Sequence, residues 1–399
     1  MRAFRWTAPL VGILLLIVAH VVALVYRVQP GVSLWFPPSG VAIVLSLWMG
    51  PLGALLTGLV SVIMAPFWGM HGWARVLGVL DCAEPLVAWV LYRGVFQGSL
   101  TLNNLRSVNV FLLSAPLAAC FTSAAIGCSV LAQFGKVPQA QFFETLAHWW
   151  VGNAIGTIVV VPIALILITP VLARWGWVSR SLVDESLPPF QGAFAWERTH
   201  WLESFAIVLS TTLLGLISVQ ATHFSLFVTL QFSLLGMIPI VWAACRFGIL
   251  GGVLAANWTV LVSLLAYLVF YPGAIALPQF PVDPQLLHLH KLNLFLQCAM
   301  ALVIGAAVTE WASGRLALTI EQERSKAYQA TAQLSERLLQ VNRLLTESNQ
   351  QYQASEERFR TSVENMLDCF CVCSAMRDEA GQIVDFRIDY MNDAACFSN

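Results

Sequence analysis

Charged residues are scarce in this 399-residue chain, at 11% of the sequence. Soluble domains use about 25%. The scarcity is also uneven, because residues 1–309 contain 12 Lys or Arg and 8 Asp or Glu, whereas the last 90 contain 9 and 14. We therefore expect an integral membrane region followed by a water-soluble tail. The net charge of the tail, −5, argues against nucleic acid as a partner.

Motifs of common catalytic chemistry are also missing. No histidine follows His290, so the tail lacks the phosphoacceptor of a histidine kinase. The GGDEF and EAL strings of cyclic-di-GMP enzymes and the GxxxxGK[ST] phosphate loop are absent. None of the nine cysteines forms a CxxC pair, so neither a disulfide framework nor a zinc site is implied. We predict no enzyme activity, no cofactor and no metal site.

Long apolar runs fill the first three quarters of the chain. We place spans near residues 8–26, 39–50, 52–67, 74–93, 107–134, 148–172, 204–220, 226–245, 248–271 and 292–311. The second and third are short enough to form one broken hairpin. The expected fold is an all-α polytopic membrane protein with eight to ten transmembrane helices. Arginines gather on the side of Arg2 and Arg5, which predicts that both termini are cytoplasmic.

The last apolar run continues without an evident break into a charged helix. Leu334, Leu338, Val341 and Leu345 follow the a and d spacing of a short coiled coil. We therefore expect a cytoplasmic signalling helix over residues 313–358 that pairs with a second copy of the chain.

Three ionisable residues fall within the span at 74–93. Asp81 and Glu84 are three positions apart on one expected helical face, and Arg75 precedes them. Ionisable groups at bilayer depth are costly and usually face the bundle interior with a partner. Three roles remain open for this group: an internal ion pair, a proton or ion sensor, and a ligand contact.

Histidines form a second pattern, since five of the seven fall on the predicted outer side: His71, His148, His223, His288 and His290. These residues fit ordinary surface positions. Alternatively they sense acid, or His288 and His290 bind a metal together with Asp283.

An internal repeat is also possible. The glycine-rich tetrapeptide at residues 50–53, followed by Leu56, recurs in similar form at 248–251, followed by Leu254. The recurrence indicates either a duplicated helical hairpin or two similar turns.

Three stretches together resemble the first family of bacterial membrane-associated sensor domains, the MASE type. They are residues 34–40, with Trp35, Pro37, Pro38 and Gly40; residues 78–88, around Glu84; and residues 150–156, with Trp150, Gly152, Asn153 and Gly156, leading to Pro162. The resemblance covers roughly residues 8–312. It implies an integral sensory domain that feeds cytoplasmic kinase, cyclase or phosphodiesterase modules. An acidic residue often stands at the place of Asn153 in that family, so Asn153 is a further candidate position for which the resemblance implies no charge-dependent role.

The tail, residues 359–399, is similar to the opening of a PAS domain. A helix is expected at 357–368, strands at 369–375 and 383–391, and a hairpin turn at 378–381. The pattern stops before a PAS fold is complete, so we expect an incomplete α/β tail that encloses no cofactor. We attribute the stop to a truncated reading frame, a fragment or a split gene.

Two hypotheses follow from these patterns. The favoured one is a sensory input domain that relays a stimulus through the coiled coil to PAS and output modules, with the bilayer, a second copy and a cytoplasmic output protein as partners. The alternative is a transporter or channel for a small solute, because broken helices and buried charges are typical of such proteins.

Overall fold

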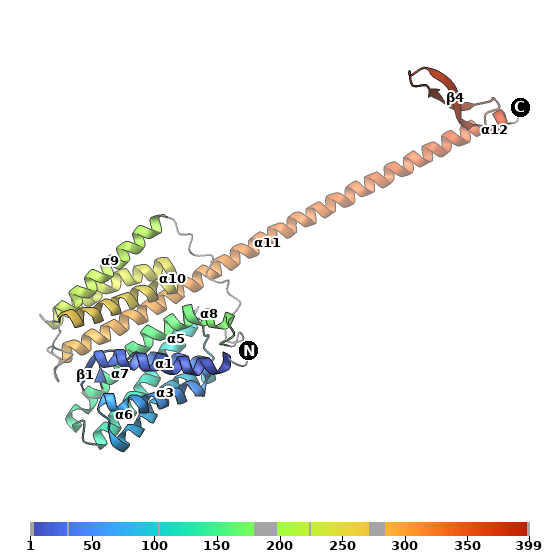
Figure 1. The fold of residues 1–399 in the computed structure, drawn as a ribbon. Coiled ribbons are helices and arrows are strands. Elements are labelled where there is room, and N and C mark those ends of the chain that lie inside the picture. Colours follow the sequence, from blue (N-terminus) through green and yellow to red (C-terminus); the bar gives the residue numbers. More distant parts are fainter. Residues whose placement is uncertain are drawn as a thin grey trace. The chain divides into compact units, whose positions relative to one another are not determined.

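The computed structural model describes residues 4–29, 32–102, 104–178, 198–222, 225–270 and 284–396. Its contacts divide the chain into two compact units, Met1–Arg315 and Leu316–Asn399. The first unit is helical apart from one short strand pair (Figure 1). Its elements are α1 (Phe4–Val25), β1 (Arg27–Gln29), β2 (Val32–Ser33), α2 (Pro37–Met49), α3 (Pro51–Met64), η1 (Ala65–Trp68), η2 (Gly72–Cys82), α4 (Ala83–Trp89), η3 (Val90–Val95), α5 (Leu105–Leu112), η4 (Leu113–Ala119), α6 (Cys120–Gln133), η5 (Gln139–Gln141), α7 (Phe142–Ile163), η6 (Ala164–Ile168), α8 (Thr169–Arg174), α9 (Arg198–Ala221), α10 (Leu226–Phe270) and the first part of α11 (Pro284–Glu364).

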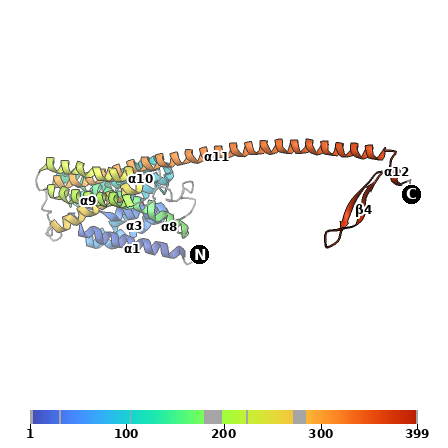
Figure 2. The ribbon, with the colours of Figure 1, turned by 90° about the horizontal axis from the view of Figure 1, so that it is seen from above.

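The first unit has two sides. Helices α9, α10 and the start of α11 lie together on one side, while α1 and α3 lie on the other (Figures 1 and 2). Helix α7 packs against α2, α6 and α10. It therefore connects the two sides through its own contacts.

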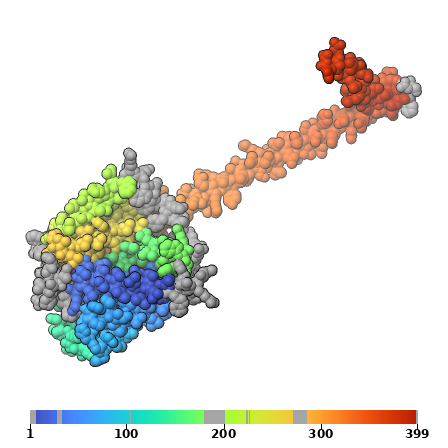
Figure 3. All heavy atoms as spheres, viewed as in Figure 1, coloured from blue at the N-terminus to red at the C-terminus, as the bar shows by residue number. Residues whose placement is uncertain are grey.

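The outer surface of this unit is apolar. Leu10, Leu14 and Val18 of α1 are each more than half exposed, and α1 lies open on the face seen in Figure 3. Among the described residues, seven helices are long and apolar enough to cross a membrane, and α2 is a shorter apolar helix. Apolar side chains facing outward and backbone hydrogen bonds made within helices are what a bilayer requires. The prediction of a polytopic helical membrane protein is confirmed.

Two glycine turns have almost the same backbone conformation. Gly50, between α2 and α3, has φ 67° and ψ −146°, and Gly248, inside α10, has φ 63° and ψ −155°. Glycine adopts a positive φ without the steric cost that a Cβ atom imposes on other residues. Gly248 divides α10 into two helices at the boundary expected between residues 245 and 248. The similar fragments at 50–53 and 248–251 thus build the same kind of helical hairpin.

The segment expected as one α-helix at 74–93 is different in the structure. It is a 3-10 helix in η2, an α-helix in α4 and a π-helix in η3. Pro85, which has no N–H to donate, is tolerated because it lies in the first turn of α4. Gly78 packs directly on the backbone of Ser61, so η2 lies close to α3.

The second unit contains the rest of α11, which is a continuous helix of 81 residues, and a small hairpin. Strand β3 (Cys371–Arg377) pairs with the antiparallel β4 (Ile383–Met391), and α12 (Asp393–Cys396) follows. The predicted bounds of the second strand, 383–391, are therefore correct. Asn392 is buried and holds the hairpin to the helix end by donating to the carbonyl oxygens of Val363 and Asp368, each at 3.1 Å. These elements fit the expected incomplete α/β tail.

Candidate functional site

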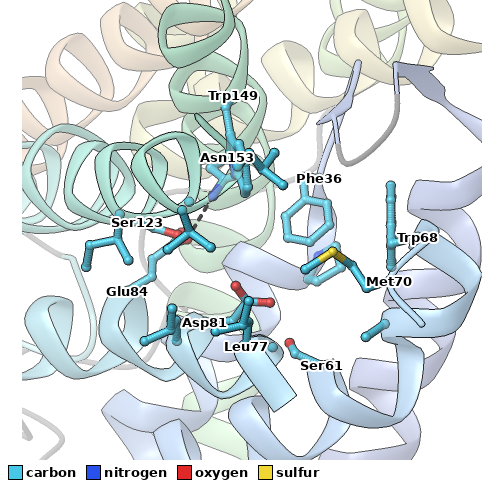
Figure 4. Close-up of a pocket in the computed structure, with 18 of the residues that line it drawn as sticks. Phe36, Ser61, Trp68, Met70, Leu77, Asp81, Glu84, Ser123, Trp149 and Asn153 are labelled. Atoms are coloured by element: carbon cyan, nitrogen blue, oxygen red, sulfur yellow. Dashed lines mark hydrogen bonds between the residues drawn. The ribbon is translucent and has the colours of Figure 1, made fainter. Parts of the chain in front are cut away.

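A pocket of about 260 Å³ lies among helices of the first unit (Figure 4). Its polar lining combines hydroxyl, carboxyl and amide groups, which come from Ser39 of α2, Thr57 and Ser61 of α3, Asp81 of η2, Glu84 of α4, Ser123 of α6, and Thr145 and Asn153 of α7. Few positions in a bilayer carry this many polar groups without a function.

The pocket has an exposed end and a buried end. Gly69, Lys136 and Gln141, from the segments before η2 and before α7, line it and are exposed. Glu84 and Asn153 line the opposite end and are only 4% and 2% exposed. The pocket therefore leads from the surface into the bundle.

The Glu84 carboxyl group joins four helices. Its Oε1 accepts hydrogen bonds from the hydroxyl of Ser39 and from the Cys120 thiol, the latter at 3.2 Å. Its Oε2 accepts from Nδ2 of Asn153 at 2.8 Å. These donors come from α2, α6 and α7, and all are buried. Three neutral donors thus supply the hydrogen bonds that a buried carboxylate needs.

The hydrogen-bond network extends one residue further. The Cys120 sulfur also lies 3.3 Å from the Thr157 hydroxyl on α7. A thiol has a single hydrogen, so if Cys120 donates to Glu84, Thr157 donates to Cys120. Helix α7 is therefore connected to Glu84 twice, directly through Asn153 and indirectly through Thr157.

Asp81 lines the same pocket and is half-buried. The hydroxyl of Ser61, which is buried, lies beside it and interacts with its carboxyl group, although no hydrogen bond of ordinary length joins the two (Figure 4). The proposed internal ion pair with Arg75 is wrong for the described residues, since Arg75 is exposed and no ion pair joins it to Asp81 or Glu84. Arg75 is not among the residues that line the pocket.

Glycines bring α2 and α7 into direct contact next to the Glu84 hydrogen bonds. A Cβ atom on Gly40 would lie 2.4 Å from the Gly156 carbonyl oxygen, and one on Gly156 would lie 2.0 Å from the Phe36 carbonyl oxygen. The Phe36 N–H donates to the Gly152 carbonyl oxygen at 3.3 Å. Ser39 and Asn153 reach Glu84 from two helices whose backbones touch.

The remaining motif residues shape these helices. Pro37 and Pro38 occupy the first positions of α2, where their fixed φ suits a helix start. Trp35 stacks edge-on against Tyr26 at 6.0 Å, and the indole N–H of Trp150 donates to the Pro116 carbonyl oxygen at 3.0 Å. Pro162 lies near the end of α7, immediately before the π-helical η6. Proline has no N–H to donate within the helix, and an irregular helical turn commonly lies next to it.

The histidines differ in part from the surface positions expected for them. His148 and His288 have ring centroids 4.7 Å apart, whereas His290 is buried, with Nδ1 3.4 Å from the Ser218 hydroxyl. In the described part of the chain, no group of three or more His, Cys, Asp or Glu residues is arranged to hold a metal ion. His223 and Asp283 lie outside the described residues.

Several site residues were missed by sequence reasoning. Ser39 stands beside Gly40 in a stretch already singled out, but Cys120 and Thr157 carry no motif. Lys291, which begins the last apolar stretch, is also part of the helix contacts, since it is 2% exposed and donates to the His148 carbonyl oxygen of α7. A lone lysine at the head of an apolar run was the available signal for it.

Comparison with known proteins gives one result. A family model described as MASE1 matches residues 6–311. No significant match was found among curated proteins or among solved structures.

Proposed function

Because the chain belongs to the MASE1 family of membrane sensory domains, we propose that the Glu84 pocket receives its stimulus and that α11 carries the response to cytoplasmic modules. Those modules are PAS and an output unit of the histidine kinase or cyclic-di-GMP type. The membrane is the bacterial inner membrane, with both termini in the cytoplasm, as the arginine distribution favours. The residues described here contribute no catalytic step.

One contact carries the proposal. The ammonium group of Lys291, at the start of α11, donates to the carbonyl oxygen of His148 on α7 at 2.9 Å. His148 lies five residues before Asn153, which binds Glu84. A change in the pocket that moves α7 therefore acts on α11 through a single helix.

The same stretch of α11 is fixed again further along. The Ile249 N–H, next to the Gly248 break in α10, donates to the Thr309 hydroxyl oxygen at 3.0 Å. A Cβ atom on Gly305 would lie 2.5 Å from the Ile249 Cα. Two attachments 18 residues apart, about 27 Å at the helical rise, let α11 shift or rotate as one rigid element. A two-state element of this kind is what transmission requires.

The proposal requires α11 to pair with a second copy. Leu334, Leu338, Val341 and Leu345 are 59–66% exposed in the single chain. In a background where the exposed native cysteines are serine, we expect Leu338→Cys and Leu345→Cys to form disulfide-linked dimers in oxidised membranes. Glu336→Cys and Gln340→Cys, on the other faces of the heptad, are the controls. Equal cross-linking at all four positions would exclude a specific seam.

The relay itself is tested by combining variants. We expect Glu84→Gln to change the rate of Leu338→Cys cross-linking about twofold or more, within the couplings of 0.5–2 kcal/mol found in such networks. Lys291→Met removes the bond to His148 and should abolish this difference, because α11 no longer follows α7. Lys326→Met, which breaks only an exposed ion pair with Glu323, is the matched control. An undiminished Glu84→Gln effect in the Lys291→Met background would refute the relay.

A further inference from the structure

Among the described residues, the acidic groups that line the Glu84 pocket do not form ion pairs with basic side chains. Two carboxyl groups line it, together with the side chains of Lys136 and His20. The Lys136 ammonium lies at the exposed end, 3.5 Å from the Met70 sulfur, and Nδ1 of His20 accepts from the Trp68 indole N–H at 3.3 Å. No ion pair involving Asp81 or Glu84 occurs among the residues described. The interior of the pocket thus presents two carboxyl groups that no described cationic side chain pairs with.

The two carboxyl groups are not equivalent. The Glu84 carboxyl group accepts hydrogen bonds from three donors of the protein. Asp81 has only the buried Ser61 hydroxyl beside it, and no hydrogen bond of ordinary length joins the two. Buried polar groups normally have partners. Asp81 and Ser61 therefore keep more hydrogen-bonding capacity for a ligand than Glu84, and Asp81 is the more exposed of the two carboxyl residues.

Aromatic rings complete the lining. Phe36, Trp68 and Trp149 surround the same space as Asp81 (Figure 4). Trp68 is held edge-on against Phe36 at 5.8 Å and against His20 at 6.3 Å. Trp149 fills space left by a glycine, since a Cβ atom on Gly127 would lie 2.4 Å from its ring. Aromatic faces attract cations, with tryptophan the strongest.

The combination selects one class of ligand. An anion would face two carboxyl groups, and a hard metal ion needs six or more oxygen ligands, whereas the described residues hold no metal-binding cluster. The pocket, at about 260 Å³, is below the roughly 300–1,000 Å³ of sites for drug-sized ligands. We propose that it binds a small organic cation, with the ammonium group between Asp81 and the rings of Trp68 and Trp149. The role of this ligand as the stimulus rests on the proposed function, whereas its binding to the pocket does not.

The test compares choline with its neutral isostere 3,3-dimethylbutan-1-ol, on the purified full chain in nanodiscs, by tryptophan fluorescence and calorimetry. We expect choline to bind about tenfold or more tightly, a difference of 1.4 kcal/mol. Ethanolamine serves as a second cation, and sodium chloride at matched ionic strength as the inorganic control. Equal affinity for choline and the isostere, or full competition by sodium, would overturn the inference.

Variants locate the site. Asp81→Asn should remove the preference for choline, whereas Glu144→Gln, an exposed carboxyl outside the pocket, should leave it unchanged. Trp68→Phe should keep part of the affinity and Trp68→Leu should lose it. Gly127→Ala should weaken binding by displacing the Trp149 ring without changing any charge. Gel filtration and circular dichroism confirm that each variant is folded. Retained preference in folded Asp81→Asn and Trp68→Leu proteins would contradict the site.

The cation site and the relay would be refuted by different results. If choline binds but leaves Leu338→Cys cross-linking unchanged, the cation site stands and the relay is refuted. If Glu84→Gln alters cross-linking but neither choline nor ethanolamine binds, the relay stands and the cation inference is refuted. Accumulation of labelled choline in proteoliposomes would support the site and favour the transporter hypothesis over the relay.

Discussion

Replacing Gly156 with alanine is expected to prevent the membrane unit from assembling. The new Cβ atom would lie 2.0 Å from the Phe36 carbonyl oxygen and 2.6 Å from its carbonyl carbon, both backbone atoms. Overpacking usually costs about 1–3 kcal/mol. Here no side chain can rotate away, so we expect a cost above about 4 kcal/mol, which is exceptional for one substitution. The measurement is the yield of monodisperse protein in mild detergent and its thermal midpoint.

Gly94→Ala is the matched control, because a Cβ atom at Gly94 would meet nothing within 4 Å. This variant should purify like the unmodified protein. A Gly156→Ala protein with normal yield and midpoint would show that α2 and α7 do not touch as described.

The second large effect is expected from Glu84→Ala. Removal of the carboxyl group leaves the donors of Ser39, Cys120 and Asn153 without their acceptor inside the bundle. Each buried donor left unsatisfied costs about 1–3 kcal/mol, so the total loss should reach at least about 3 kcal/mol. Denaturation in mixed detergent micelles measures it. Asn153→Ala combined with Glu84→Ala should cost less than the sum of the two single changes, because the partners share one bond.

Glu144→Ala provides the control, since that carboxyl is 58% exposed on α7. Its effect should stay within about 0.5 kcal/mol, as for most surface substitutions. Strict additivity of Glu84→Ala and Asn153→Ala would mean that the two side chains do not interact.

Patterns that depend on neighbours in sequence were predictable. The continuity of α11, the strand at 383–391 and the break near Gly248 follow from local apolar spacing and glycine placement. Asp81 and Glu84 stood out because carboxyl groups are expensive in an apolar run. The partners of Glu84 were not predictable, since Ser39, Cys120 and Asn153 lie 45, 36 and 69 residues away. Only the folded bundle brings them together.

The type of helix in residues 74–93 could not be predicted from local sequence patterns either. Apolar spacing in residues 74–93 fits an α-helix, and nothing in it specifies the change from a 3-10 to an α and then a π conformation. The close approach of Gly78 to Ser61 is a tertiary constraint on that segment. Propensity is a weak guide where such packing decides. The internal ion pair with Arg75, one of the three roles left open, presupposed regular α-helical spacing.

The short helix α2 has a consequence for biosynthesis. Its 13 residues extend about 20 Å, whereas a bilayer core is about 30 Å thick. Helix α2 is therefore a poor independent substrate for the insertion machinery. The tight turn at Gly50 and the contact of Gly53 with the Leu45 backbone join it to α3, so the two should enter the lipid as one hairpin. Ser39 and Ser61 would then reach the membrane together, before the helices that carry Glu84 and Asn153 have been synthesised.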